Sequence, residues 1–541
     1  MQSTMMQVPL SVNHHLLERC GLLFGKREIV SRLPDKSISR TNYTSLYDRA
    51  RRLAAALVRE GVKPGEPVGT LMWNSIWHLE AYFGIPAAGA ALHTLNLRLS
   101  PDDLAYIIRD AGDRIVLVDD VLLPLLEKVL PLVEIERIIV VPTSGAPVPP
   151  RYENYEAFIS PDAANFVYPA LDENAPCGMC YTSGTTGRPK GVVHSHRAVV
   201  LHALSVGLPD CLNLSCHDSV LVATPMFHVN AWGVPFAAAM VGCSLSMPGQ
   251  YLGPEDLLDI MESEQVSLAL GVPTIWMAIL QTLDKQPGRW KLRRGMRMMV
   301  GGAAAAPSLI AGLERHGLSI KHGWGMTELT PVGTLCWLKP EHTSLPAEQQ
   351  YEIRARQGLP IPLMELRTMG ENGPQPWDGK SVGELQIRGP IVTAGYHNQL
   401  AGPDKLTDDG WFRTGDVASI DTEGYMRITD RSKDLIKSGG EWISSVELEN
   451  AIMGHPAVAE AAVIAVTHPK WDERPLAVVV KRADMDVSTE ELRSFIAPRF
   501  AKWQLPDDFT FVDALPRTTT GKFLKTALRE RFKDWVSRTP G

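Results

Sequence analysis

The chain has 541 residues, of which 45% are hydrophobic and 21% charged, and its 54 basic and 61 acidic residues give a net charge of −7. This length predicts two or more packed units, and the composition excludes disordered, collagen-like and coiled-coil proteins. The acidic balance argues against a dedicated nucleic-acid binder, which would carry a basic stripe, but it leaves room for a local cationic pocket.

The first half of the chain alternates helical and strand patterns. Between Thr44 and Gly61 apolar residues recur at helical spacing, and the glycine stands where a helix should end. Short β-rich runs lie at 114–118 and 138–141, and a helical stretch lies at 102–110. Such alternation predicts α/β layers with largely parallel sheets.

The pattern changes after Pro360. Residues 378–389 alternate polar and apolar side chains with period two, which predicts a smaller β-rich unit. The charged segment 430–434 separates this part from a last β/α stretch, in which we expect a helix at 489–500. The predicted fold class is therefore α/β, with layered α/β subdomains and a β-rich subdomain followed by a small α+β lobe.

We expect three divisions of the chain: an N-terminal body at 1–429, a hinge at 430–434 and a C-terminal lobe at 435–541. The first residues lack a basic region followed by a long apolar run, so no signal peptide is predicted. The longest apolar stretch, 231–247, is interrupted by Gly and Pro, so no membrane span is predicted. We therefore expect a cytoplasmic protein.

The seven cysteines are too few, and odd in number, for a full disulfide framework. Cys177 and Cys180 have the C-x-x-C spacing, but a zinc site needs a second pair, and Cys211 with Cys216 is spaced too widely. We interpret Cys177 and Cys180 as small buried residues of a strand.

The most informative segment reads YTSGTTGRPKG, from Tyr181 to Gly191. Its glycines allow tight turns that expose backbone N–H groups, and its hydroxyl residues and Lys190 add donors and a positive charge. A Walker A loop needs Gly-Lys-Ser/Thr, whereas Lys190 stands between Pro189 and Gly191. We interpret the segment as a polyphosphate-binding loop of another kind rather than an ordinary surface turn.

Further motifs accompany this loop in order along the chain. They are PMFHVNAW at 225–232, GGAA at 301–304, GWGMTE at 323–328, WFRTGD at 411–416, DRSKDLIKSGGEW at 430–442 and PRTTTGK at 516–522. Together they resemble those of the adenylate-forming enzymes, the superfamily of acyl-CoA synthetases, peptide-synthetase adenylation domains and beetle luciferase. The likeness is greatest to the fatty-acyl-CoA synthetase branch, including bacterial long-chain and medium-chain ligases and methylmercaptopropionate-CoA ligases.

This resemblance implies a two-step ligase that uses ATP, Mg²⁺ and coenzyme A. A carboxylic acid and ATP would give acyl-AMP and pyrophosphate, and the thiol of coenzyme A would then attack the mixed anhydride. We expect a fatty-type acid of medium or long chain, and a short thioether acid such as 3-methylmercaptopropionate is the alternative with the same chemistry. The partners would be these small molecules and a second copy of the chain, as a homodimer.

The resemblance assigns residues to the metal and the phosphates. Thr182 and Glu328 would contact Mg²⁺, since a hydroxyl and one carboxylate suit an ion that keeps several waters and takes phosphate oxygens. Thr327 would contact the α-phosphate. The other expected contacts of the phosphate loop are Ser183, Gly184, Thr185, Thr186, Gly187 and Lys190.

The nucleoside would occupy the next motifs. Asp416 would accept hydrogen bonds from both ribose hydroxyls, because a carboxylate offers several lone pairs to adjacent donors. Trp324 would stack on adenine in a slot shared with Gly302, Gly323 and the backbone of His322. Many family members carry Tyr where this chain has Trp324, so a phenolic contact in that slot is lost here.

Lys522 is the residue that we expect to catalyse adenylation, because a fixed positive charge stabilises the charge that builds up in phosphoryl transfer. Arg431, Lys433 and Lys437 would add contacts to ribose and phosphate. Asp430 resembles the hinge residue about which the lobe turns between the half-reactions. The residues facing the site during thioester formation would be Ser438, Gly439, Gly440, Glu441 and Trp442.

His228 and Trp232 resemble the acyl-site pair of the branch. His228 would lie near the carboxylate and count among the catalytic residues, and Trp232 would gate an apolar tunnel. The remaining expected contacts are Val229, Gly302 and Gly325. His194 and His196 have no such support, and we interpret them as structural.

Two alternatives belong to other classes. An amino-acid adenylation role is less favoured, since no conspicuous acidic residue stands near His228 to hold an ammonium group and no carrier domain follows the lobe. A catalytically silent nucleotide-binding protein on the same fold would be expected to lose at least one of Lys522, Glu328 and Asp416, or part of the loop.

Overall fold

The computed structural model describes residues 3–182, 188–400, 402, 404–431, 433–438, 441–468, 470–483, 485–517 and 523–535. Several expected site residues lie outside these ranges: Ser183, Gly184, Thr185, Thr186, Gly187, Gly439, Gly440 and Lys522. The side chains of Glu441 and Trp442 are also outside the description.

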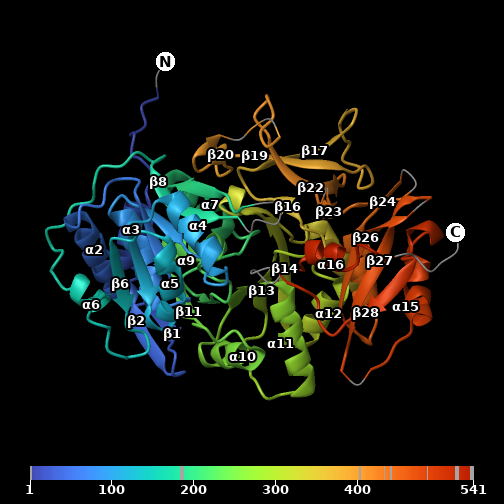
Figure 1. Cartoon of the computed structure of the whole chain (residues 1–541), viewed down its shortest axis with the longest axis horizontal. Coiled ribbons are helices and arrows are strands. Elements are labelled where there is room, and N and C mark those ends of the chain that lie inside the picture. Colours follow the sequence, from blue (N-terminus) through green and yellow to red (C-terminus); the bar gives the residue numbers. More distant parts are fainter. Residues whose placement is uncertain are drawn as a thin grey trace.

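The molecule consists of a large N-terminal body and a smaller lobe formed by the end of the chain. In Figure 1 the body occupies the left and centre, the lobe is red and lies at the right, and a β-rich unit lies above in orange. Helices and predominantly parallel sheets alternate in the body. The α/β class expected from the sequence is confirmed.

One sheet of the body has the order β7-β6-β5-β3-β4-β8-β9, and all its neighbours are parallel except β8 and β9. Its strands are β3 (Pro67–Leu71), β4 (Ala91–Thr94), β5 (Ile115–Asp119), β6 (Arg137–Val141), β7 (Glu153–Asn154), β8 (Pro176–Tyr181) and β9 (Gly191–Ser195). The helices of this part are α2 (Tyr43–Arg59), α3 (Ile76–Ala87), α4 (Pro101–Ala111), α5 (Leu123–Val129), α6 (Tyr155–Phe158) and α7 (His196–Gly207).

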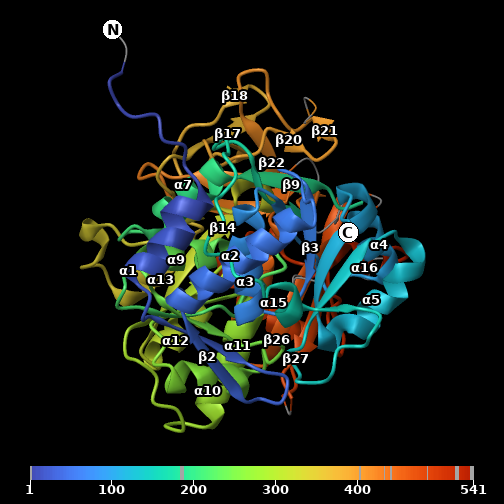
Figure 2. The ribbon, with the colours of Figure 1, turned by 90° about the vertical axis from the view of Figure 1, so that its left-hand side faces the viewer.

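The first of these helices illustrates how local sequence sets its ends. The side chain of Asn42 accepts a hydrogen bond from the N–H of Ser45 over 3.0 Å and so caps the start of α2. Gly61, just beyond the end, has a φ of +77°, which glycine adopts without a Cβ penalty. The helix predicted between Thr44 and Gly61 is therefore confirmed, and it lies beside α3 in both views (Figures 1 and 2).

A second sheet of the body has the order β16-β15-β14-β13-β12-β10-β11-β1-β2. Its strands from β14 to β1 are parallel to one another, and antiparallel β2, β15 and β16 lie toward its edges. The strands are β1 (Glu28–Arg32), β2 (Ile38–Asn42), β10 (Ser219–Leu221), β11 (Ser244–Met247), β12 (Leu268–Gly271), β13 (Met296–Val300), β14 (Leu318–Gly325), β15 (Val332–Leu335) and β16 (Leu359–Pro360). The helices are α1 (Arg19–Leu23), α9 (Val234–Val241), α10 (Pro254–Ser263), α11 (Pro273–Lys285), α12 (Pro307–Arg315) and α13 (Ala347–Arg354).

The β-rich unit predicted after Pro360 is an antiparallel sheet of order β18-β17-β19-β22-β23. Its strands are β17 (Glu365–Gly370), β18 (Gly373–Pro374), β19 (Gly383–Arg388), β22 (Phe412–Ile420) and β23 (Met426–Arg431), with a small ribbon of β20 (Gly395–Tyr396) and β21 (Gln399–Leu400). The alternating pattern at 378–389 corresponds to β19.

The lobe contains β24 (Ile436–Ser438), β25 (Glu441–Ile443), β26 (Val458–His468), β27 (Asp472–Lys481), β28 (Asp508–Phe511), α14 (Ser445–Met453), α15 (Thr489–Ile496) and α16 (Lys525–Arg531). Its strands and helices enclose hydrophobic clusters of their own. The helix expected at 489–500 is α-helical only to Ile496 and continues as a 3₁₀ turn, Ala497–Arg499, in which Pro498 has no N–H to donate.

These sheets direct several motifs toward one region. The chain leaves the carboxyl ends of β10, β13 and β14 at residues 222, 301 and 326, just before or within the expected site motifs. Ligands of open α/β sheets bind outside the carboxyl ends of parallel strands. The β8–β9 hairpin, which bears the glycine-rich loop, contributes Thr182 to the same region.

Candidate active site

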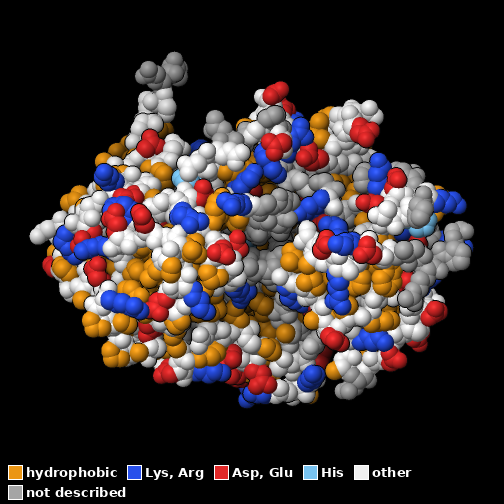
Figure 3. All heavy atoms as spheres, viewed as in Figure 1, with side chains coloured by type: hydrophobic (Ala, Val, Ile, Leu, Met, Phe, Trp, Pro, Cys, Tyr) orange, Lys and Arg blue, Asp and Glu red, His pale blue; other side chains and the backbone are white. Residues whose placement is uncertain are grey.

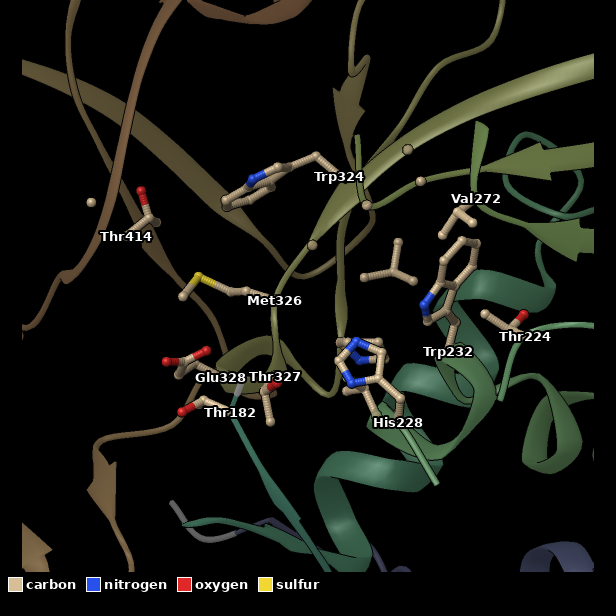
Figure 4. A pocket seen from close by; sticks show the side chains of 18 of the residues that line it. Thr182, Thr224, His228, Trp232, Val272, Trp324, Met326, Thr327, Glu328 and Thr414 are labelled. Carbon is tan, nitrogen blue, oxygen red and sulfur yellow. The ribbon is translucent and has the colours of Figure 1, made fainter. Parts of the chain in front are cut away.

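A cavity of about 450 Å³ opens in this region. Figure 4 shows Thr182, Thr327 and Glu328 gathered at one end, Trp232 at another, and His228 between them in this view. The cavity brings together most of the residues expected from the motifs: Thr182, Lys190, His228, Val229, Trp232, Gly302, Gly323, Trp324, Gly325, Thr327, Glu328, Arg431 and Lys433.

A second hollow of about 720 Å³ adjoins the first and lies between the body and the lobe. It shares Trp324 and Arg431 with the first cavity and adds His322 and Asp416. The space-filling view shows the surface hollowed near its middle, between these two parts (Figure 3). The expected nucleotide residues therefore face a space that is open toward the lobe.

Two hydrogen bonds between Thr182 and Lys190 hold the start of the glycine-rich loop. The N–H of Thr182 donates to the carbonyl of Lys190 over 3.0 Å, and Thr182 Oγ1 accepts from the N–H of Lys190 over 3.1 Å. These bonds close the hairpin at the last described residue before the loop. They position Thr182 at the cavity wall.

Glu328 lies in a short 3₁₀ turn, Thr327–Leu329, and is only 6% exposed. The hydroxyl of Tyr396 donates to its Oε1 over 2.9 Å, and its own carbonyl accepts from the N–H of Thr393 over 2.8 Å. Burial, together with the adjacent Glu328 carboxylate, raises the pKa of Tyr396 above its usual range, so the tyrosine remains a donor at neutral pH.

The donor set at this end fits Mg²⁺. Among the described residues no group of three or more His, Cys, Asp and Glu side chains gathers as a metal site. Mg²⁺ does not require one, because it binds through one or two carboxylates, water and substrate phosphates. Within the described chain Glu328 Oε1 takes the Tyr396 bond, while Thr182 Oγ1 lies on the same cavity wall.

The expected adenine and ribose residues form a hydrogen-bonded set. Trp324 Nε1–H donates to Asp416 Oδ2 over 2.8 Å, and Arg431 Nε lies 2.7 Å from Asp416 Oδ1. His322 is buried beside this slot, and its side chain points elsewhere, since Nδ1 donates to the carbonyl of Ala355 over 2.9 Å. Burial lowers the pKa of His322 to about 4 and keeps the ring neutral.

The end of the cavity that is expected to hold the acyl group lies on a turn with unusual backbone angles. From Val229 to Trp232, the segment α8 (Val229–Trp232), every φ lies between +45° and +58°, so the chain turns in the left-handed sense. Such geometry costs roughly 1–2 kcal/mol per non-glycine residue and is concentrated at functional sites. The turn presents His228 and Trp232 to the cavity (Figure 4).

The indole of Trp232 packs against the backbone of Gly301, which has no side chain. A Cβ added to Gly301 would lie 3.3 Å from Trp232 Cη2, closer than ordinary van der Waals contact. Val272 lies beside this ring in Figure 4, and Met299 and Val332 are further apolar residues that line the cavity. This end of the cavity can therefore receive a hydrocarbon group.

Two expected residues of the lobe are not brought to the cavities. Lys437 and Ser438 belong to β24, and neither is among the described residues that line the two hollows. Ser438 is buried, and its Oγ accepts from Arg474 over 2.9 Å. The backbone of Glu441 and Trp442 forms β25, antiparallel to β24, in the sheet of the lobe.

The two histidines interpreted as structural are both buried. His194 Nε2 donates to the carbonyl of Thr327 over 2.9 Å, so it supports the turn that carries Glu328. His196 Nδ1 accepts from the N–H of Val12 over 3.2 Å. Cys177 and Cys180 lie buried in β8, as expected, and both are free thiols.

Sequence reasoning missed Tyr396, which contacts both Glu328 and Lys190. Besides its bond to Glu328, its ring lies 4.9 Å from Lys190 Nζ, within cation–π range. Tyr396 stands 68 positions after Glu328, outside every motif named above. Arg188, Met326 and Thr414 also line the cavity; they lie within the quoted motifs, but the motifs assigned them no role. Lys405 lines the cavity and lies outside every motif.

Comparison with protein families gives the class of the molecule. A family described as AMP-binding enzyme matches residues 24–397, and one described as AMP-binding enzyme C-terminal domain matches residues 447–522. The chain belongs to the AMP-binding enzyme family. The resemblance drawn from the motifs is thus confirmed.

Individual relatives are similar along their whole length. A long-chain-fatty-acid–CoA ligase of Thermus thermophilus is 49% identical over 98% of this chain and 97% of its own. A 3-methylmercaptopropionyl-CoA ligase of Ruegeria pomeroyi is 44% identical over 99% of both chains. The crystal structure of the anthranilate CoA ligase AuaEII with anthranoyl-AMP superposes with a TM-score of 0.85 at 25% identity, covering 97% of this chain and 98% of that one.

Within the described ranges, no helix combines the length and the apolar character that crossing a bilayer requires.

Proposed function

We propose that this protein joins a medium- or long-chain fatty acid to coenzyme A in two steps at one site. The reaction class, an AMP-forming acid–CoA ligase, follows from the family and from the named activities of the relatives. The observation that carries the proposal is the single cavity in which a polar end, with Thr182 and Glu328, faces an apolar end, with Trp232.

In the first step an oxygen of the acid would attack the α-phosphorus of ATP, and pyrophosphate would leave. Thr182, Thr327 and the glycine-rich loop would bind the phosphates, and Lys522 would bring a positive charge to the acid and the α-phosphate. Mg²⁺ held by Thr182 and Glu328 would neutralise phosphate charge. Trp324 and Asp416 would bind the nucleoside.

In the second step the thiol of coenzyme A would attack the acyl carbon, and AMP would leave with the electron pair of the broken anhydride bond. The thiol proton passes to solvent or base. We propose that the lobe, 435–541, turns about 430–434 for this step, because Lys437 and Ser438, which are described residues of the β24–β25 segment, are not among the residues that line the cavity in the present arrangement. The turn would exchange Lys522 for that segment, with Gly439 and Gly440 leaving room for the pantetheine arm.

The acid is assigned by the chemistry of the cavity end around Trp232. Its apolar walls suit an alkyl group, and His228 lies on the side of the polar cluster, where a carboxylate would be. A short thioether acid is the second candidate, favoured by the relative from Ruegeria pomeroyi, whose name specifies 3-methylmercaptopropionyl-CoA. Both acids would undergo the same two steps.

Two further expectations belong to this proposal. We propose a homodimer and a cytoplasmic location, both by analogy with the fatty-acyl-CoA synthetase branch. Size-exclusion chromatography with light scattering tests the first: the expected mass is twice that of the chain, and a monomeric mass at micromolar concentration would refute it.

The substrate is tested by pyrophosphate release. The assay uses ATP, Mg²⁺, coenzyme A and a series of short, medium, long, aromatic and thioether acids. We expect the highest kcat/KM for medium or long aliphatic acids. A maximum at 3-methylmercaptopropionate would select the second candidate, and no release with any acid would favour a catalytically silent protein.

The catalytic lysine is tested by separating the half-reactions. Lys522→Ala should abolish acyl-AMP formation yet leave CoA transfer to synthetic acyl-AMP largely intact. Lys533→Ala is the matched control, because Lys533 is an exposed lysine of the same region that pairs only with Glu530 among the described residues. Normal rates of both half-reactions in Lys522→Ala would remove the assignment.

A further inference from the structure

The indole of Trp324 and the carboxylate of Asp416 are joined directly. The bond from Nε1–H to Oδ2 is 2.8 Å long and links residues 92 positions apart. Trp324 lies at the end of β14 and Asp416 in β22, so the bond connects the second sheet of the body to the β-rich sheet. Asp416 is only 3% exposed. Because a buried charge is costly unless it is paired or hydrogen-bonded, its carboxylate depends on such partners.

The ring of Trp324 is held from a second side by the neighbouring strand. A Cβ added to Gly333, in β15, would lie 2.7 Å from Trp324 Cζ3, so the ring rests on a position without a side chain. Figure 4 shows the ring projecting from its strand toward the strand that carries Thr414, two residues before Asp416. The bond to Asp416 and the contact with Gly333 together fix the plane of the indole.

The carboxylate of Asp416 keeps acceptor capacity after these contacts. Arg431 Nε lies 2.7 Å from Oδ1, and Trp324 Nε1–H donates to Oδ2. A carboxylate has about four acceptor positions, two on each oxygen. One position on each oxygen is therefore left beside the hollow that Asp416 lines.

We infer that Trp324 is a positioning residue for the ribose-binding carboxylate as well as a surface for the base. Its indole N–H orients Asp416 so that the remaining acceptor position of each oxygen receives one of the two adjacent ribose hydroxyls. Phenylalanine at this position would keep a stacking ring but would leave Oδ2 without its donor. The inference rests on the proposed function, which assigns this slot to ATP.

The experiment measures binding of ATP and of 2′,3′-dideoxyATP by titration calorimetry, without acid so that no turnover occurs. For Trp324→Phe we expect the Kd of ATP to rise about tenfold, equal to about 1.4 kcal/mol. The Kd of 2′,3′-dideoxyATP should rise by less than about twofold, because that nucleotide has no hydroxyls for Asp416 to bind. The weakening of binding would thus depend on the ribose hydroxyls. A residue that only stacks on the base would weaken both nucleotides equally.

Trp377→Phe is the matched control, since Trp377 is 45% exposed and lies outside the lining of both hollows among the described residues. Trp324→Tyr is a second variant, should the phenylalanine variant fail to fold, and it also lacks a donor at the indole position. Equal weakening of both nucleotides would reduce Trp324 to a stacking surface and overturn the inference, and so would unchanged Kd values.

The outcomes separate this inference from the function on which it rests. A wild-type protein that binds neither nucleotide would refute the proposed function and this inference with it. A wild-type protein that prefers ATP over 2′,3′-dideoxyATP, combined with a Trp324→Phe variant that keeps the same preference, would refute the inference alone.

Discussion

The hydroxyl of Tyr396 donates a hydrogen bond to Glu328 Oε1 over 2.9 Å, and the same ring lies 4.9 Å from Lys190 Nζ. One side chain in the small β20–β21 ribbon thus contacts both the buried carboxylate and the lysine of the glycine-rich loop. Because a buried carboxylate depends on its hydrogen-bond donors for orientation, Tyr396 is expected to position Glu328.

Tyr396→Phe should slow acyl-AMP formation about tenfold and raise the Mg²⁺ concentration needed for half-maximal rate, because a hydrogen bond to a charged group contributes about 1.5–3 kcal/mol. The ring remains, so the contact with Lys190 is retained. Pyrophosphate release measured against Mg²⁺ concentration checks both effects. Tyr152→Phe is the control, since Tyr152 donates to Glu127 over 3.2 Å at the surface. An unchanged Mg²⁺ dependence would contradict the positioning role.

Trp232→Ala should change the preference for chain length while the KM for ATP changes less than about twofold. The indole fills space against Gly301 at the apolar end, so removing it enlarges the cavity there. Longer or branched acids should gain in kcat/KM relative to the wild-type optimum. Gly301→Ala supplies the opposite change, because its new Cβ would press on the Trp232 ring. Unchanged selectivity in an acid series would exclude Trp232 as a determinant of specificity.

A buried ion pair lies in the lobe, close to the end of the motif that contains Lys522. Lys525 Nζ lies 2.6 Å from Glu449 Oε1, and both side chains are about nine-tenths buried. Lys525→Met should destabilise the lobe by about 3–5 kcal/mol, because it leaves Glu449 buried without its partner. The double variant Lys525→Met/Glu449→Gln should recover much of this loss. Thermal unfolding followed by circular dichroism should give a higher melting temperature for the double variant than for Lys525→Met. Equal melting temperatures for the two variants would contradict the role of the ion pair.

His78 makes stability depend on pH. Burial lowers its pKa to about 3, and its neutral ring donates from Nδ1 to the carbonyl of Trp73 over 3.1 Å. In the unfolded chain the pKa of His78 is about 6.5. The neutral ring therefore contributes fully to the free energy of unfolding above that pH, and this contribution is lost as the pH falls toward 3. At pH 5 the loss is about 2 kcal/mol, from 1.5 pH units at about 1.36 kcal/mol each.

His78→Gln removes this dependence, so the melting temperatures of wild type and variant should converge between pH 7 and pH 5. Melting curves at pH 7, 6 and 5 measure the difference in melting temperature between wild type and variant. His217→Gln is the control at an exposed histidine and should leave the pH dependence of the wild type intact. A gap that stays constant with pH would show that His78 is not the titrating group.

Local sequence predicted the parts of the site that are contiguous in the chain. The hairpin ending at Thr182 and the turn with Thr327 and Glu328 each depend on neighbouring residues, and both lie where the motifs indicated. Strand β27 begins at Asp472, four residues before its apolar stretch starts at Leu476. Its first residues are polar and include Pro475, and they are strand because they pair with β26.

The sequence alone determined the family, the order of the motifs and the residue types at the site, because each motif is a short segment with its own backbone requirements. Only the tertiary structure decided which side chains meet. The bond from Trp324 to Asp416 joins two sheets, and the bond from Tyr396 to Glu328 joins a ribbon to a turn. Such contacts depend on how distant elements pack against each other. Burial of hydrophobic side chains across the whole body determines this packing, and the local sequence pattern does not contain it.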